Sequence, residues 1–239
     1  MSMEERTAGT VLDLLQQLNP KQQEAVTHVE GPLLVLAGAG SGKTRVITYR
    51  VAYLINVCGV SPWNILAVTF TNKAAGEMRE RIHQLVAEKA EGVWVSTFHS
   101  LCARLIRQHA NKLDLQQGFT IYDRSDQMTV VRKAMEGSTY QDSRSLKPAT
   151  FLNAISKAKS SLLSPIDVLE QAKDDMQKLS AVVYGEYEDI LRQHNALDFD
   201  DLLVYGVRLL SEHEDVRERY QKRFHHVLVD EYKDTNHPQ

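Results

Sequence analysis

The sequence contains little cysteine and no long hydrophobic run. Only two of its 239 residues are cysteines, Cys58 and Cys102, and neither belongs to a CxxC pair. This pattern argues against a disulfide framework and against a zinc site, and it predicts two buried thiols. No apolar run approaches the roughly 20 residues that a membrane-spanning helix needs, and the N-terminal "MSMEERTAGT" lacks the apolar core of a signal peptide. We therefore expect no membrane contact and a cytoplasmic, nucleoid-associated location, or a nuclear one if the source is eukaryotic.

An overall positive charge is also absent. The formal net charge is -3, so any contact with nucleic acid must be local rather than spread over the whole surface. One segment is locally basic, because ten lysines and arginines stand against five acids between Arg104 and Lys159. This excess is equally consistent with a solvated helical surface and with a patch that contacts phosphates.

Short apolar runs alternate with helical patterns in the first part of the chain. The runs "PLLVLAG", "NILAVTF" and "GVWVSTF" predict buried strands, each followed by a helix, and a further run, "VLV", comes near the end. This order is typical of an α/β fold with a parallel sheet. Helical patterns dominate the long segment between "GVWVSTF" and "VLV". We therefore predict three segments: residues 1–112 and 196–239 form the α/β part, and residues 113–195 form an inserted helical subdomain.

The stretch "AGAGSGKT", residues 37–44, has the spacing of a phosphate-binding loop with alanine in place of the usual first glycine. Its glycines permit backbone conformations that other residues avoid, so that successive N–H groups can turn toward the β- and γ-phosphates. Lys43 would supply a point charge and Thr44 a hydroxyl ligand for Mg²⁺, at the start of a helix that points its N-terminus at the anion. The sequence therefore predicts binding of ATP with Mg²⁺ by Ala39, Gly40, Ser41, Gly42, Lys43 and Thr44.

Two acids at the end of the last apolar run complete the predicted site. Asp230 would hold the Mg²⁺ through water, and Glu231 would orient and deprotonate the attacking water. Lys43, Asp230 and Glu231 are thus the predicted catalytic residues, and Thr44 and Asp230 the predicted metal ligands. This arrangement favours hydrolysis over transfer to a substrate, although an exposed acid pair after a strand is the alternative. The segment "LDFDDLL" also carries three acids, but its pattern by itself indicates only the start of a helix.

In their order along the chain, the motifs resemble those of the superfamily 1A DNA helicases of the UvrD/PcrA/Rep type. "LNPKQQEAV" resembles their glutamine motif, "AGAGSGKT" motif I, "TFTNKAAGEMRERI" motif Ia, "STFHS" motif Ib and "DEYKDTN" motif II, and "LDFDDL" also resembles a family segment. The resemblance covers almost the whole chain. It implies a P-loop, RecA-like parallel sheet flanked by helices, with an inserted, mostly helical subdomain.

The resemblance also implies roles that the residues alone leave open. Gln22 would read the adenine edge through its amide, and Arg45 would lie against the base. Phe70 would stack on a base of single-stranded DNA, as sequence-independent binding requires. The implied DNA-binding residues are Thr69, Phe70, Thr71, Asn72, Thr97 and His99.

For two of these residues an ordinary structural role remains open. Phe70 could be a core aromatic at the end of a strand, and His99 could be a structural histidine with satisfied hydrogen bonds. The motifs alone do not choose between these interpretations.

The leading hypothesis is the N-terminal part of an ATP-dependent DNA helicase that acts on single-stranded DNA and on junctions of single- and double-stranded DNA. The resemblance implies translocation from 3′ to 5′, in repair or replication. Two departures qualify it: Lys233 replaces the glutamine usual in motif II, and no segment after that motif is present to supply a second motor domain. We therefore expect poor hydrolysis by these residues alone. A stand-alone nucleotide- and DNA-binding module without unwinding activity is the alternative, and a metabolic P-loop kinase is a weaker third.

Overall fold

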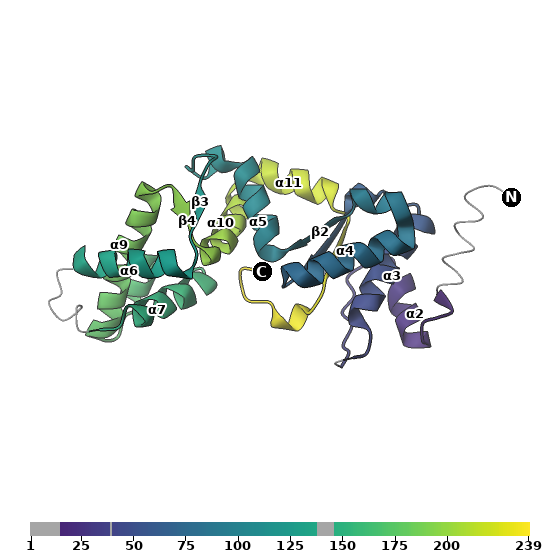
Figure 1. Cartoon of the computed structure of the whole chain (residues 1–239), viewed down its shortest axis with the longest axis horizontal. Helices are drawn as coiled ribbons and strands as arrows, with labels where there is room; N and C mark the ends of the chain where they lie inside the picture. The colour runs from purple at the N-terminus through teal and green to yellow at the C-terminus, as the bar shows by residue number, and fades with distance from the viewer. Residues whose placement is uncertain (1–14, 39, 138–145) are drawn as a thin grey trace. The chain divides into compact units, whose positions relative to one another are not determined.

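The computed structural model describes residues 15–38, 40–137 and 146–239. These residues divide into two compact units (Figure 1). The first unit contains the described residues up to Phe98 together with Glu218–Asp234, and the second contains His99–Arg217 with Thr235–Gln239. The division into segments at 112/113 and 195/196 stays a prediction.

A parallel three-stranded sheet forms the centre of the first unit. Its strands are β1 (Ile65–Thr69), β2 (Trp94–Thr97) and β5 (His226–Val229), in the order β2-β1-β5. All five residues of β1 are buried, as a continuous apolar run in a central parallel strand requires. These strands confirm the predictions made from "NILAVTF", "GVWVSTF" and "VLV", and with the flanking helices they confirm the α/β fold class.

Among the described residues, the α-helices α2 (Pro20–Thr27), α3 (Lys43–Asn56) and α4 (Asn72–Val86) flank this sheet. α2 begins at a capping box between Asn19 and Gln22, with proline at its first position. α3 follows the glycine-rich loop, and α4 follows β1. The buried sides of α3 and α4 share one apolar core with β1, β2 and β5, and α2 packs against α3.

The predicted strand at residues 32–38 is absent from the structure. The segment has no regular secondary structure, and Leu33, Leu34 and Leu36 are 41%, 63% and 87% exposed. A strand requires a hydrogen-bonded neighbour, and among the described residues β5 pairs only with β1. The apolar run therefore has neither a ladder nor a covering layer, and the prediction from "PLLVLAG" was wrong.

The second unit is mostly helical. Its elements are α5 (Phe98–Gln108), β3 (Thr120–Ile121), α6 (Arg124–Gly137), α7 (Pro148–Ser160), α8 (Pro165–Glu170), α9 (Asp175–Gln193), β4 (Ala196–Leu197) and α10 (Phe199–Glu212), and α11 (Glu214–Arg223) leads back to the first unit. β3 and β4 form a short parallel pair. Helices α6, α7 and α9 lie next to one another (Figure 1). They enclose a core in which Phe151 and Tyr187 are fully buried. None of the described helices is long and apolar enough to cross a membrane.

The two thiols differ in their surroundings, which corrects the prediction that both are buried. Cys58 follows α3 and is exposed. Cys102 lies on α5 against Gly206 of α10, and burial raises the pKa of its thiol to about 12. Only Cys102 therefore behaves as an interior cysteine.

Candidate nucleotide and DNA site

The glycine-rich loop ends at Gly42, which initiates α3 in a left-handed conformation with φ 87°. Among the described residues no side chain caps this helix, so its first N–H groups remain available to an anion. Gly40 also has a positive φ of 74°, so both positions require the freedom of glycine. Ala39 was predicted to bind the nucleotide, but it lies outside the described residues.

Lys43 lies between the loop and the acid pair. Its Nζ is 3.4 Å from the Gly38 carbonyl oxygen and 3.4 Å from Oε1 of Glu231. Glu231 follows β5 with a positive φ of 51°, an unusual conformation for a residue with a Cβ. The second oxygen of Glu231 is 3.8 Å from Nζ of Lys233, at an exposed pair. Two cations therefore flank the predicted water-activating carboxylate.

The side chains of Thr44 and Asp230 are in contact at the carboxyl edge of the sheet. The Thr44 hydroxyl donates a hydrogen bond of 3.2 Å to Oδ2 of Asp230. The Asp230 backbone N–H donates to the Val68 carbonyl at 2.9 Å, which places the carboxylate at the carboxyl end of the ladder. Its side chain is only 5% exposed, and Oδ1 accepts the Glu231 N–H at 3.0 Å.

This donor set fits Mg²⁺ of the type bound with a nucleotide. Mg²⁺ at such sites takes one or two protein oxygens and keeps waters and phosphate oxygens as its other ligands. Thr44 and Asp230 offer one hydroxyl and one carboxylate. Among the described residues no group of three or more His, Cys, Asp or Glu side chains could form a dedicated metal cage.

Gln22 and Arg45 lie near the loop on neighbouring helices. The Gln22 amide donates to the Ser41 carbonyl at 2.9 Å, while its oxygen accepts the Asn19 N–H in the capping box. The Arg45 guanidinium lies over the Tyr49 ring at 5.1 Å. It also borders a cavity of about 260 Å³ between α3 and α4, lined by Arg45, Thr48, Tyr49, Arg81, Gln84 and Leu85.

The predicted DNA-binding residues of motifs Ia and Ib gather at the carboxyl ends of β1 and β2. Thr69 and Thr97 are register partners, and both are buried. Phe70 is half-buried and packs edge-on against Phe98, with ring centroids 5.7 Å apart. Thr71 caps α4 by accepting the Ala74 N–H. In the first unit the structure thus brings five of the predicted residues together, since Asn72 follows directly as the first residue of α4.

His99, the second residue of α5, belongs to the second unit. Its ring meets that of Phe199 edge-on at 6.2 Å, and Phe199 is 50% exposed. Burial lowers the pKa of His99, and the Asp200 carboxylate offsets part of this shift. Phe199 was not assigned a role from the sequence. The sequence signal that points to Phe199 is an aromatic residue between the acids of "LDFDDL". In the structure Asp198 and Asp201 of this segment form the cap of α10, which holds Phe199 at the surface.

Comparison with known proteins places these features in a family. Residues 18–239 match the UvrD/REP helicase N-terminal domain. The chain is 46% identical over 226 residues to the ATP-dependent DNA helicase PcrA of Staphylococcus aureus strain Mu50, and 45% identical to that of Staphylococcus epidermidis strain RP62A. Each alignment covers 95% of this chain and 31% of the relative, so the chain spans about a third of their length. The chain belongs to the UvrD/REP helicase N-terminal domain family.

Proposed function

We propose that this chain is the ATP- and DNA-binding N-terminal part of an ATP-dependent DNA helicase. The observation that carries the proposal is the convergence of Lys43, Thr44, Asp230 and Glu231 at one edge of the sheet. The relatives are ATP-dependent DNA helicases by name. We extend their dependence on ATP and their action on DNA to this chain. From the motif resemblance we further propose a role on single-stranded DNA and at its junctions with duplex, 3′ to 5′ translocation, and cytoplasmic work in repair or replication.

In the proposed nucleotide site each side chain has one task. Lys43 and the N-terminal amides of α3 bind the β- and γ-phosphates. Thr44 and Asp230 hold Mg²⁺, which when bound neutralises charge on the phosphate oxygens. Glu231 orients a water molecule and accepts its proton. Gln22 and Arg45 recognise the adenine by an amide pair and by stacking.

The proposed DNA contacts combine stacking and polar groups. Phe70 offers a ring face to a base, and Thr69, Thr71, Asn72 and Thr97 line the same strand ends. In the second unit His99 and the exposed Phe199 offer a polar ring and an aromatic surface side by side. Stacking of this kind tolerates any base, which suits a motor that moves along DNA.

We expect the 239 residues to bind MgATP more readily than they hydrolyse it. In this type of reaction an arginine supplied by another domain contributes about 10³- to 10⁵-fold in rate. The competing proposal is a module that retains nucleotide and DNA without separating strands.

The test is a pair of measurements on the purified chain: fluorescence titration with a labelled ATP analogue and Mg²⁺, and ATP hydrolysis with and without single-stranded DNA. Lys43→Ala should abolish nucleotide binding, while Lys178→Ala, an exposed lysine of α9 paired with Asp175, should leave it intact. Retained affinity in Lys43→Ala would contradict the site. A strand-displacement assay separates the two proposals, because displacement by this chain would contradict the module.

A further inference from the structure

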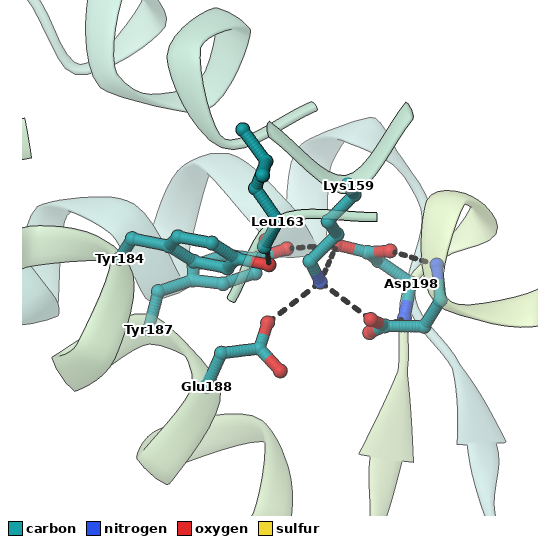
Figure 2. Close-up of polar contacts among 7 residues, drawn as sticks. Lys159, Leu163, Tyr184, Tyr187, Glu188 and Asp198 are labelled. Atoms are coloured by element: carbon teal, nitrogen blue, oxygen red, sulfur yellow. Dashed lines mark hydrogen bonds and ion pairs between the residues drawn. The ribbon is translucent and has the colours of Figure 1, made fainter. Parts of the chain in front are cut away.

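A buried lysine of the second unit is surrounded by carboxylates (Figure 2). Lys159, on α7, is 1% exposed. Its Nζ lies 2.6 Å from Oδ1 of Asp201, 2.9 Å from Oδ2 of Asp198 and 2.7 Å from Oε1 of Glu188. The Tyr187 hydroxyl donates to the same Oδ2 of Asp198 at 2.8 Å. One ammonium group therefore joins α7, α9 and the start of α10.

The cluster keeps Lys159 charged despite its burial. Burial by itself opposes the ammonium form, but the three carboxylates outweigh it and raise the pKa of Lys159 well above its usual value. Asp198 is likewise disfavoured by burial, yet Lys159 and the hydrogen bonds hold the pKa of Asp198 below its usual value. Such a buried cluster contributes little net stability compared with apolar packing, but its geometry is tightly constrained.

The same two aspartates form the cap of α10. Oδ1 of Asp198 accepts the Asp201 N–H at 2.8 Å, and Oδ2 of Asp201 accepts the Asp198 N–H at 3.0 Å. Each carboxylate therefore uses one oxygen for the capping box and the other for Lys159. Consequently the lysine and the cap form one hydrogen-bonded unit, and the two residues between the aspartates have little freedom.

Those two residues are Phe199 and Asp200. Phe199 is the exposed aromatic beside His99, and Asp200 is close enough to influence the His99 ring electrostatically. An aromatic side chain on a rigid backbone loses less conformational entropy when it stacks on a ligand than one on a mobile turn.

We propose that Lys159 is a positioning residue for DNA binding, which acts through Asp198 and Asp201 to hold Phe199 beside His99. The inference rests on the proposed function, since it requires that Phe199 contact single-stranded DNA. It assigns a binding role to a basic residue that itself never reaches the DNA, within the basic segment for which a solvated helical surface and a phosphate-contacting patch were equally consistent.

The test is a double-mutant cycle in the 239-residue chain, with Lys159→Met, Phe199→Ala and the double variant. Binding of a fluorescein-labelled oligo(dT) is measured by anisotropy at constant salt. We expect Phe199→Ala to weaken binding about tenfold through lost stacking, and Lys159→Met to weaken it by a similar factor. The double variant should bind no more weakly than Phe199→Ala alone, because both changes remove the same contact.

Lys157→Met is the matched control. Lys157 lies on α7 two residues before Lys159 but is exposed, so the variant loses the same charge without disturbing the cap. Any reduction in DNA affinity that Lys157→Met causes should multiply with the reduction from Phe199→Ala in the double variant, because the two residues act independently. An oligonucleotide carrying 2-aminopurine adds a direct readout, since quenching by a stacked ring should fall in Lys159→Met and persist in Lys157→Met.

Far-UV circular dichroism and thermal unfolding establish which variants are folded. If Lys159→Met does not fold, Tyr187→Phe removes the hydroxyl that donates to Asp198 and keeps the ring. It should weaken binding about twofold to fivefold, again without further loss in combination with Phe199→Ala. If the reduction in DNA affinity from Lys159→Met or Tyr187→Phe multiplies with that from Phe199→Ala, the substituted residue does not act through Phe199, and the positioning role is wrong. Unchanged binding by Phe199→Ala would instead overturn the DNA surface on which the inference rests, whereas MgATP binding would be unaffected.

Discussion

The Thr44 hydroxyl lies 3.2 Å from the Asp230 carboxylate, although 186 positions separate the two residues. The contact joins the first turn of α3 to the residue that follows β5. It arises because α3 packs on the sheet with its first turn near the edge where β5 ends, and Asp230 follows that strand directly. A hydroxyl and a buried carboxylate are thereby brought to the distance at which one small cation could bind both.

We predict that Asp230→Asn weakens the Mg²⁺-dependent part of nucleotide affinity by about tenfold or more, because a charge-assisted ligand becomes neutral. Affinity in EDTA should change little. Titration of a fluorescent ATP analogue with and without Mg²⁺ measures both quantities. Asp234→Asn, an exposed acid in the turn that follows, is the control with the same loss of charge. Equal Mg²⁺ dependence in the two variants would remove Asp230 from the metal site.

Phe70→Leu should lower the affinity for single-stranded DNA about tenfold, since base–aromatic stacking contributes roughly 1–3 kcal/mol per base. The free energy of unfolding should fall by less than about 1.5 kcal/mol, because leucine retains most of the apolar packing against Phe98. Anisotropy and urea unfolding measure the two effects. A large loss of stability with unchanged DNA affinity would identify Phe70 as a core aromatic instead.

Gly206→Ala should destabilise the second unit by about 1–3 kcal/mol through overpacking. A Cβ at Gly206 would lie 2.6 Å from Sγ of Cys102. At Gly185, on α9, a Cβ would meet nothing closer than 3.9 Å, so Gly185→Ala should stabilise by about 0.5–1 kcal/mol through helix propensity.

Urea unfolding of both alanine variants provides the measurement. Adding Cys102→Ala to Gly206→Ala should recover most of the lost stability, because the clashing sulfur is removed. Without such recovery the contact with the Cys102 sulfur is not the cause of the destabilisation.

Stability should fall as the pH is lowered through about 6.5, the ordinary pKa of histidine. The pKa of His99 is lowered by burial, so in this range the unfolded chain binds more protons than the folded chain and the free energy of unfolding rises with pH. His99→Gln should flatten this slope, and Asp200→Asn should steepen it because the carboxylate offsets part of the shift. Urea unfolding between pH 5.5 and 7.5 measures the slope; an unchanged slope in His99→Gln would assign it to other groups.

Much of the candidate site could be predicted from local sequence. The loop with Gly42, Lys43 and Thr44 needs only consecutive residues, and the helix that follows them forms as expected. The order of the motifs identified the family, because the order and spacing of motifs can stay the same when residues in other parts of the chain differ. The absence of a strand at 32–38 could not be predicted from the sequence, since an apolar run becomes a strand only where another strand offers its hydrogen bonds.

The sequence by itself determined the parallel sheet, the glycine-rich loop with its following helix and the family, because these depend on short-range patterns of apolar residues, glycines and caps. Only the tertiary structure decided which acids and bases are buried together. Lys159 reads in sequence as one more basic residue of a charged segment, yet packing of α7, α9 and α10 buries it against three carboxylates. Phe199 received no role from the sequence, and the structure leaves it at the surface beside the cap that those carboxylates form. Burial and charge pairing depend on contacts between residues distant in sequence, and these exist only once the chain has folded.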